Sequence, residues 1–170
     1  MEMASNLVEQ YRRWFEYEKD AHAKVVRSLE SVPIERRTTR EFRRAVTLLA
    51  HLAAARRVWL CRLGVLSEMP AAFFPEDIDI AAAAAELGAI QGHWDAYLAR
   101  LTDEELARTF EYKSLDAGRF RNRVEDILAQ LFGHSSYHRG QIAMLVRAAG
   151  GEPAVTDLIY WCREPVTSAG

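Results

Sequence analysis

The chain of 170 residues has the length of one ordinary domain, and 49% of its residues are hydrophobic, which is enough to build a core. A folded chain of this size buries roughly 70% of the surface that its unfolded form exposes, so it needs neither disulfides nor a structural metal to be stable. The 22 Lys and Arg residues and 24 Asp and Glu residues give a formal net charge of −2, which provides no positive field to attract a phosphate backbone. The composition therefore predicts one globular domain over residues 1–170 that does not bind nucleic acid.

The sequence gives no indication of a membrane span or an export signal. No apolar run approaches the roughly 18 residues that a membrane span requires, and the acidic, aromatic start of the chain lacks the basic flank and apolar stretch of a signal peptide. Cys61 and Cys162 lie far apart in apolar surroundings, so we interpret them as reduced packing residues rather than as a disulfide framework or a CxxC site. We expect a soluble, cytoplasmic protein that does not bind a membrane.

The first part of the chain contains two patterns of helix length. Apolar residues recur at helical spacing over residues 5–32, and Pro33 ends this run. A second helical run begins after Thr38 or Thr39, either of which can cap it, and ends at Gly64. These patterns predict the first two helices.

The middle of the chain is predicted to be a long connection followed by a third helix. Residues 70–79 contain prolines, phenylalanines and aspartates, which cannot continue a helix but can pack aromatic rings over the end of a bundle. A helical pattern follows over about residues 80–101. Its five consecutive alanines, residues 81–85, favour a helix and allow a neighbouring helix to approach closely.

Turn chemistry separates the third helix from a fourth. The segment TDEEL is read as a short capped turn, and FEYKSLDAGRF alternates aromatic and polar residues around Asp116-Ala117-Gly118, which is typical of a small hairpin or an ordered loop. Asn122 is predicted to cap the fourth helix, with Glu125 completing a capping box. The helix then ends near the glycines at 150–151.

The four predicted helices each carry one apolar stripe and can bury these stripes only against one another, which predicts an all-α, antiparallel four-helix bundle. The connection between the second and third helices is long enough to run along the bundle as a crossover, so simple up-down-up-down connectivity is not required. The segment TDLIYWCRE predicts a short C-terminal helix. Because the helices carry more large apolar residues than one inward stripe accounts for, we also expect a homodimer.

His134 and His138 on the fourth helix are the first candidates for a chemical site. They are four residues apart and share a face with Ile127 and Leu131, so both should point into the bundle, where two imidazoles can reach one metal ion. An HxxxH pair also arises by chance in helices. His51, near the edge of the apolar stripe of the second helix, is the best candidate for a third ligand; alternatively, it is a partly buried histidine bonded to a backbone carbonyl.

Other residues near these histidines have more ordinary interpretations. Arg139 is expected to pair with a carboxylate, Gln141 to form a hydrogen bond near the site, and Gly140 to allow close contact with another helix. His22 and His93 are interpreted as surface or half-buried helix residues rather than ligands. No catalytic triad, phosphate loop or dinucleotide fingerprint is visible, and no general base can be named.

The sequence resembles the DinB/YfiT-like family of metal-dependent four-helix-bundle proteins. TLLAHLAAARRVWLCRL has His51 in the place of the first family histidine, and LFGHSSYHRGQIAMLVRAAG has His134 and His138 in the places of the other two. The HRGQ tetrad with a histidine four residues before it is a specific signal, and GGEPAVTDLIYW is similar to the family's end. The resemblance implies a divalent metal, commonly zinc or nickel, held by the three histidines, and frequent dimerisation.

Characterised members of that family include thiol-dependent transferases and an isomerase. Three neutral imidazoles would leave a metal ion its double charge and at least one open position, where water or a thiolate can bind. The leading hypothesis is therefore a metal-dependent enzyme, with Zn²⁺ or Ni²⁺ and a small cellular thiol, that acts as an S-transferase on a small electrophilic substrate; hydrolase or isomerase chemistry remains open. The alternative is a non-catalytic, stress-related metal-binding protein.

Overall fold

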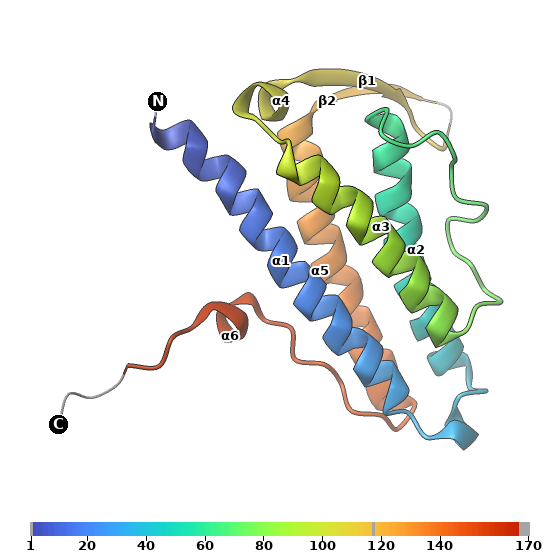
Figure 1. Ribbon diagram of the computed structural model, residues 1–170. Helices are drawn as coiled ribbons and strands as arrows, with labels where there is room; N and C mark the ends of the chain where they lie inside the picture. Colours follow the sequence, from blue (N-terminus) through green and yellow to red (C-terminus); the bar gives the residue numbers. More distant parts are fainter. Residues whose placement is uncertain (1, 117, 167–170) are drawn as a thin grey trace.

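The computed structural model describes residues 2–116 and 118–166, and four long helices make up most of it (Figure 1). The long helices are α1 (Glu2–Glu30), α2 (Arg40–Arg62), α3 (Ile80–Ala99) and α5 (Val124–Ala148). The shorter elements are η1 (Ile34–Arg36), α4 (Asp103–Ala107), β1 (Thr109–Lys113), β2 (Arg119–Arg123) and α6 (Leu158–Cys162). The predicted all-α bundle and its short C-terminal helix are confirmed.

The four long helices pack in the cyclic order α1, α3, α2, α5, and α1 and α2 share few contacts across the bundle. Figure 1 shows α1 and α5 running in one direction and α2 and α3 in the other. The consecutive helices α2 and α3 are parallel because the chain between them, residues 63–79, returns along the length of the bundle. This connection is therefore the crossover that we considered possible from its length. Among neighbouring long helices, only the pairs α1/α3 and α2/α5 are antiparallel.

Side chains fix where the middle helices begin. Thr39 is the N-cap of α2, and its hydroxyl accepts a hydrogen bond from the backbone N–H of Phe42 at 3.3 Å. Asp79 caps α3 in the same way, accepting from Ala82 N–H at 2.8 Å. Side-chain caps therefore fix the beginning of α2 and, after the crossover connection, the beginning of α3.

The start of α5 differs from the prediction by one residue. Arg123, not Asn122, is the N-cap, and the carboxylate of Asp126, rather than that of Glu125, accepts from the backbone N–H of Arg123 at 3.1 Å. Glu125 instead pairs with the Arg123 guanidinium at 2.8 Å. Asn122 is held in β2, opposite Phe110, so the strand runs almost directly into the helix. The ladder thus overrides the local capping preference of Asn122.

The hairpin of β1 and β2 lies over one end of the bundle (Figure 1). The strands pair antiparallel, from Thr109 opposite Arg123 to Lys113 opposite Arg119, which confirms the hairpin; Ala117 of the predicted turn lies outside the described residues. The Tyr112 ring lies 5.1 Å from that of Trp59 on α2. The hairpin is thereby attached to the bundle next to the end of α2.

Two glycines in the second half of the chain behave differently from expectation. A Cβ added to Gly140 would have no atom outside its own helix turn within 4 Å, so the predicted close helix contact at this glycine is wrong. The close approach occurs at Gly151, where a Cβ would lie 2.6 Å from Val32 Cγ2.

No helix of the described part of the chain has the length and apolarity to cross a membrane.

Candidate metal centre

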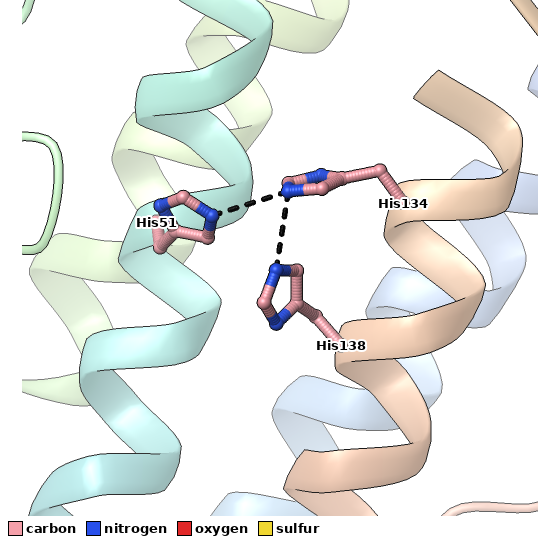
Figure 2. A group of neighbouring side chains, drawn as sticks. All are labelled: His51, His134 and His138. Carbon is pink, nitrogen blue, oxygen red and sulfur yellow. Dashed lines mark hydrogen bonds between the residues drawn. The ribbon is translucent and has the colours of Figure 1, made fainter. Parts of the chain in front are cut away.

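His51 of α2 and His134 and His138 of α5 come together between these two antiparallel helices (Figure 2). One nitrogen from each imidazole lies within 4.8 Å of the other two. The Nε2 atom of His134 is 3.2 Å from Nε2 of His51 and 3.1 Å from Nε2 of His138. The structure thus brings together the three histidines that the sequence singled out, and their role as ligands stays a prediction.

His51 lies deeper than the edge of an apolar stripe. Every residue of α2 from 45 to 56 is buried, because α3 and α5 cover this helix and the crossover connection passes over it. The Phe74 ring stacks on the His51 imidazole with centroids 4.0 Å apart, and the Phe73 ring meets it edge-on at 4.5 Å. The aromatic rings of the connection therefore cover the histidine cluster, not the end of the bundle where we expected them.

The Nδ1 atoms of His51 and His138 form hydrogen bonds that hold these two imidazoles in place. His51 Nδ1 donates to the carbonyl oxygen of Phe73 at 2.8 Å, and His138 Nδ1 donates to Oε1 of Gln141 at 2.7 Å. The expected hydrogen bond of Gln141 near the site is confirmed. His51 also makes the backbone carbonyl bond of the alternative interpretation, yet this bond orients its Nε2 into the cluster. Neutral His51 and His138 therefore each present a lone pair on Nε2.

The three Nε2 atoms at the centre of the cluster carry too few hydrogens to satisfy both of their contacts. Neutral His134 carries one N–H and can donate it from Nε2 to only one of its two neighbours. At least one lone pair thus faces another nitrogen with no hydrogen between them. A tetrahedral zinc ion with bonds of about 2.0–2.1 Å separates its nitrogen ligands by roughly 3.3–3.4 Å, close to the two distances observed here. The donor set therefore fits a divalent cation, and two of its three nitrogen separations are close to the spacing that such an ion requires.

Burial keeps these imidazoles neutral. Burial, with the positive charges of His138, His51 and Arg56 after it, lowers the pKa of His134 to about 4. Burial also lowers the pKa values of His51 and His138, and Arg44 adds to both shifts. All the charged neighbours that shift these pKa values are cationic. Neutral imidazoles grouped in this way could bind a metal ion near neutral pH, and the cationic neighbours would favour an anion beside it.

A buried ionic cluster lies behind the histidines. Arg139 donates to Glu18 Oε1 at 2.7 Å, which confirms its predicted pairing with a carboxylate. Arg56 pairs with the other oxygen of Glu18 and donates to Ser135 Oγ at 3.0 Å, directly beside His134 in the chain. Glu18 and Arg56 were not predicted from the sequence, although Glu18 lies seven residues from both Tyr11 and Val25, on the buried face of α1.

The two histidines outside the cluster have different environments. His22 is 2% exposed and not at the surface or half-buried as predicted, and burial lowers its pKa well below the usual range. Its Nδ1 lies 3.0 Å from Nε2 of Gln91 on α3, so it packs between α1 and α3. His93 is exposed, as expected. Neither of them belongs to the three-histidine group.

A small cavity adjoins the cluster at His134. Its volume is about 160 Å³, and it lies between α2 and α5, with Phe73 of the crossover connection and Leu115 beyond β1 completing its wall. The protein therefore belongs to the class of helical bundles that contain a candidate divalent-metal centre. The cavity leaves room for a small ligand next to this centre.

The family model described as "DinB family" matches residues 3–164, nearly the whole chain. The chain therefore belongs to the DinB family, as the resemblance of its histidine motifs indicated. Comparison with curated proteins and with solved structures gives no significant match.

Proposed function

We propose that this protein binds one divalent metal ion through His51, His134 and His138 and uses it to activate a small thiol for attack on an electrophilic substrate. The observation that carries this proposal is the set of three Nε2 atoms that face one another with too few protons to pair them. When bound, the metal would supply the positive charge that deprotonates a thiol at neutral pH. Imidazole ligands suit both Zn²⁺ and Ni²⁺, the two metals we favour.

The surrounding residues support an anionic ligand at this centre. Phe73 and Gln141 hold two imidazoles in orientation, and the rings of Phe73 and Phe74 keep water away from His51. Because the charged neighbours Arg44 and Arg56 are positive, a thiolate is stabilised there more than a neutral ligand is. The thiolate would form the new carbon–sulfur bond while the substrate releases its leaving group, as an S-transferase requires.

The nucleophile comes from outside the chain in this proposal. Burial raises the pKa of the Cys61 thiol, and its Sγ donates to the carbonyl oxygen of Glu68 at 3.2 Å, so Cys61 is a poor thiolate. Cys162 lies in α6 and is not part of the histidine group. Replacing both cysteines by serine should therefore spare activity.

One observation favours the non-catalytic alternative. Among the described residues that line the cavity beside His134 there is no aspartate or glutamate, so a carboxylate general base is missing from its wall. A metal-binding protein without enzymatic activity needs no such base. Thiol transfer also manages without one when the metal itself acidifies the thiol, which is why we place it first.

The experiment compares metal binding and thiol binding in three proteins. Metal-free wild type, His138→Ala and the exposed control His93→Ala are incubated with Zn²⁺, Ni²⁺ or Co²⁺, and bound metal is counted by elemental analysis. We expect about one ion per chain in the wild type and in His93→Ala, and none in His138→Ala, because two imidazoles rarely hold a divalent ion against dilution. The cobalt and nickel forms are then titrated with thiols and screened with electrophiles, with metal-free protein as the control.

The outcomes separate the two functions. A sulfur-to-metal charge-transfer band with thiols, together with metal-dependent turnover of an electrophile, supports the enzyme. Metal binding with neither band nor turnover supports the non-catalytic alternative. Full metal retention in His138→Ala would contradict the proposed ligand set.

A further inference from the structure

The cavity beside His134 has a second polar end at Arg62. This arginine belongs to the last turn of α2 and lines the same cavity as His134, with Ala55, Val58 and Leu131 as apolar wall between them. Side chains of a helix lean toward its N-terminus, so the guanidinium of Arg62 reaches back along α2 in the direction of His51. One small space is thus bounded by a ligand histidine and by a guanidinium.

Arg62 is held in place without being neutralised. The centre of its guanidinium lies 4.5 Å from the Trp59 ring centroid and 4.7 Å from that of Tyr112. Its Nε is buried and has no hydrogen-bond partner among the described residues, and no described carboxylate lies within 4.0 Å of it. Aromatic faces orient a cation without removing its charge. The uncompensated positive charge of Arg62 is therefore left for something that enters the cavity.

The size and charge of the space restrict that ligand. A dry protein cavity of about 150 Å³ can hold benzene, so 160 Å³ has room for roughly six non-hydrogen atoms. No acidic side chain of the described wall would repel an anion. A guanidinium binds a carboxylate through two parallel hydrogen bonds, which fixes both position and orientation. The cavity therefore fits a short molecule that is anionic at the end away from His134.

We propose that the thiol activated at this centre carries a carboxylate, which binds Arg62 while its sulfur lies at the His134 end of the cavity. The inference rests on the proposed function and gives it a substrate class, small mercaptocarboxylates. Arg62 acts as the specificity-determining residue, and Trp59 and Tyr112 position it. The β1–β2 hairpin contributes to this selection because Tyr112 belongs to β1.

The test uses two thiols of matched length. Cobalt-loaded protein is titrated with 3-mercaptopropionate and with 3-mercaptopropanol, and binding is followed by the charge-transfer band. Wild type should bind the carboxylate thiol at least about 10-fold more tightly, the effect of a charge-assisted hydrogen-bond pair. Arg62→Met should abolish this preference while metal content and mercaptopropanol affinity stay within twofold. The control Arg121→Met, on the exposed side of the hairpin, should behave as wild type.

A second variant covers the case in which Arg62→Met does not fold. Arg62→Lys keeps the charge but not the planar fork, and should retain part of the preference. Equal affinity of wild type for the two thiols, or an unchanged preference in a folded Arg62→Met protein, overturns the assignment of Arg62 and leaves the proposed function intact. Metal-loaded protein that binds neither thiol overturns both.

Discussion

Glu18 compensates two buried guanidinium groups inside the bundle. The side chains of Glu18, Arg56 and Arg139 are each no more than 2% exposed, so two positive charges share one carboxylate. Nε of Arg56 and of Arg139 find no partner among the described residues, and burial lowers the pKa of Arg56. The excess positive charge lies on the same side of the bundle as Ser135, next to His134.

Removing this carboxylate should be costly. Glu18→Gln leaves both guanidinium groups buried without a counter-charge, so we expect the free energy of unfolding to fall by about 3–5 kcal/mol. Urea denaturation measures the change. The control Glu16→Gln removes the exposed partner of Lys19, 2.6 Å away, and should cost less than about 1 kcal/mol. Equal losses in the two variants would mean that the buried Glu18 carboxylate stabilises the fold no more than an exposed ion pair does.

The histidine cluster makes the metal-free protein sensitive to acid. The pKa of His134 is about 4 in the folded chain, against about 6.5 when unfolded, so the unfolded state binds more protons between these values. The melting temperature of metal-free protein should therefore fall as pH decreases from about 6.5 to 4. Buried His22, whose pKa is also lowered, contributes in the same direction. His134→Asn should show a shallower fall over this window, and an identical slope would rule out the shift.

At the residue scale, sequence spacing predicted the side chains that share a helix face, but it did not predict most of the contacts across the bundle. His134 and His138 follow from an interval of four; His51 was a candidate from its place on the second helix, and the family motifs decided between its two interpretations. The burial of His22 and the Glu18–Arg56 pair depend on which faces of α1, α2 and α3 come into contact. Periodicity within one helix does not specify that choice.

At the scale of elements, the end of α5 is fixed against the end of α1. Gly150 has a φ of +86°, which ends the helix, and a Cβ at Gly151 would lie 2.6 Å from Val32 and 2.9 Å from Val146. Ser28 Oγ then donates to the carbonyl oxygen of Glu152 at 2.6 Å. The tail of the chain is thereby directed back across α1.

Gly151→Ala should push these two helix ends apart. We expect a loss of about 1–3 kcal/mol in the free energy of unfolding, the usual cost of forcing an extra methyl group into packed space. Gly140→Ala, inside α5, is the control, because that site is exposed and open, and the substitution should stabilise the protein by up to about 1 kcal/mol through helix propensity. Thermal melts of both variants give the comparison, and a neutral Gly151→Ala would show that the turn can move.

Most boundaries of the helices followed from local chemistry, whereas the directions of the helices did not. Thr39 as a cap and Pro33 as a helix end are readable from the chain itself. The parallel packing of α2 and α3 requires residues 63–79 to return along the bundle, and Phe73 and Phe74 of this connection pack on His51 through tertiary contacts. The start of α5 likewise shifted because pairing in β2 took up Asn122.

For the whole molecule, metal removal should lower the stability of the fold without unfolding it. The apolar core extends through all four long helices and does not depend on the histidine cluster. A chelator should therefore lower the melting temperature of the metal-loaded protein, since binding stabilises the folded state by mass action, while far-ultraviolet circular dichroism at 25 °C stays unchanged. His138→Ala should not respond to the chelator. Complete unfolding on chelation would make the metal structural.

The homodimer stays a prediction. Tyr137 is 64% exposed and Met144 72% exposed, both on the outer face of α5, so large apolar side chains do remain on the surface after the bundle has closed. Composition predicted this excess, but which face a partner would cover depends on surface shape rather than on periodicity.

The three imidazoles come from two distant parts of the chain, with His51 separated from His134 by 83 positions. A chain emerging from the ribosome presents His51 and the Phe73 carbonyl long before α5 is made, and with one imidazole it has no chelating site. With the proposed ligand set, metal uptake would have to wait until α5 has been synthesised and docked against α2. Acquisition of the ion would then mark a finished polypeptide, and a truncated chain that ends before residue 134 would remain in the cell without it.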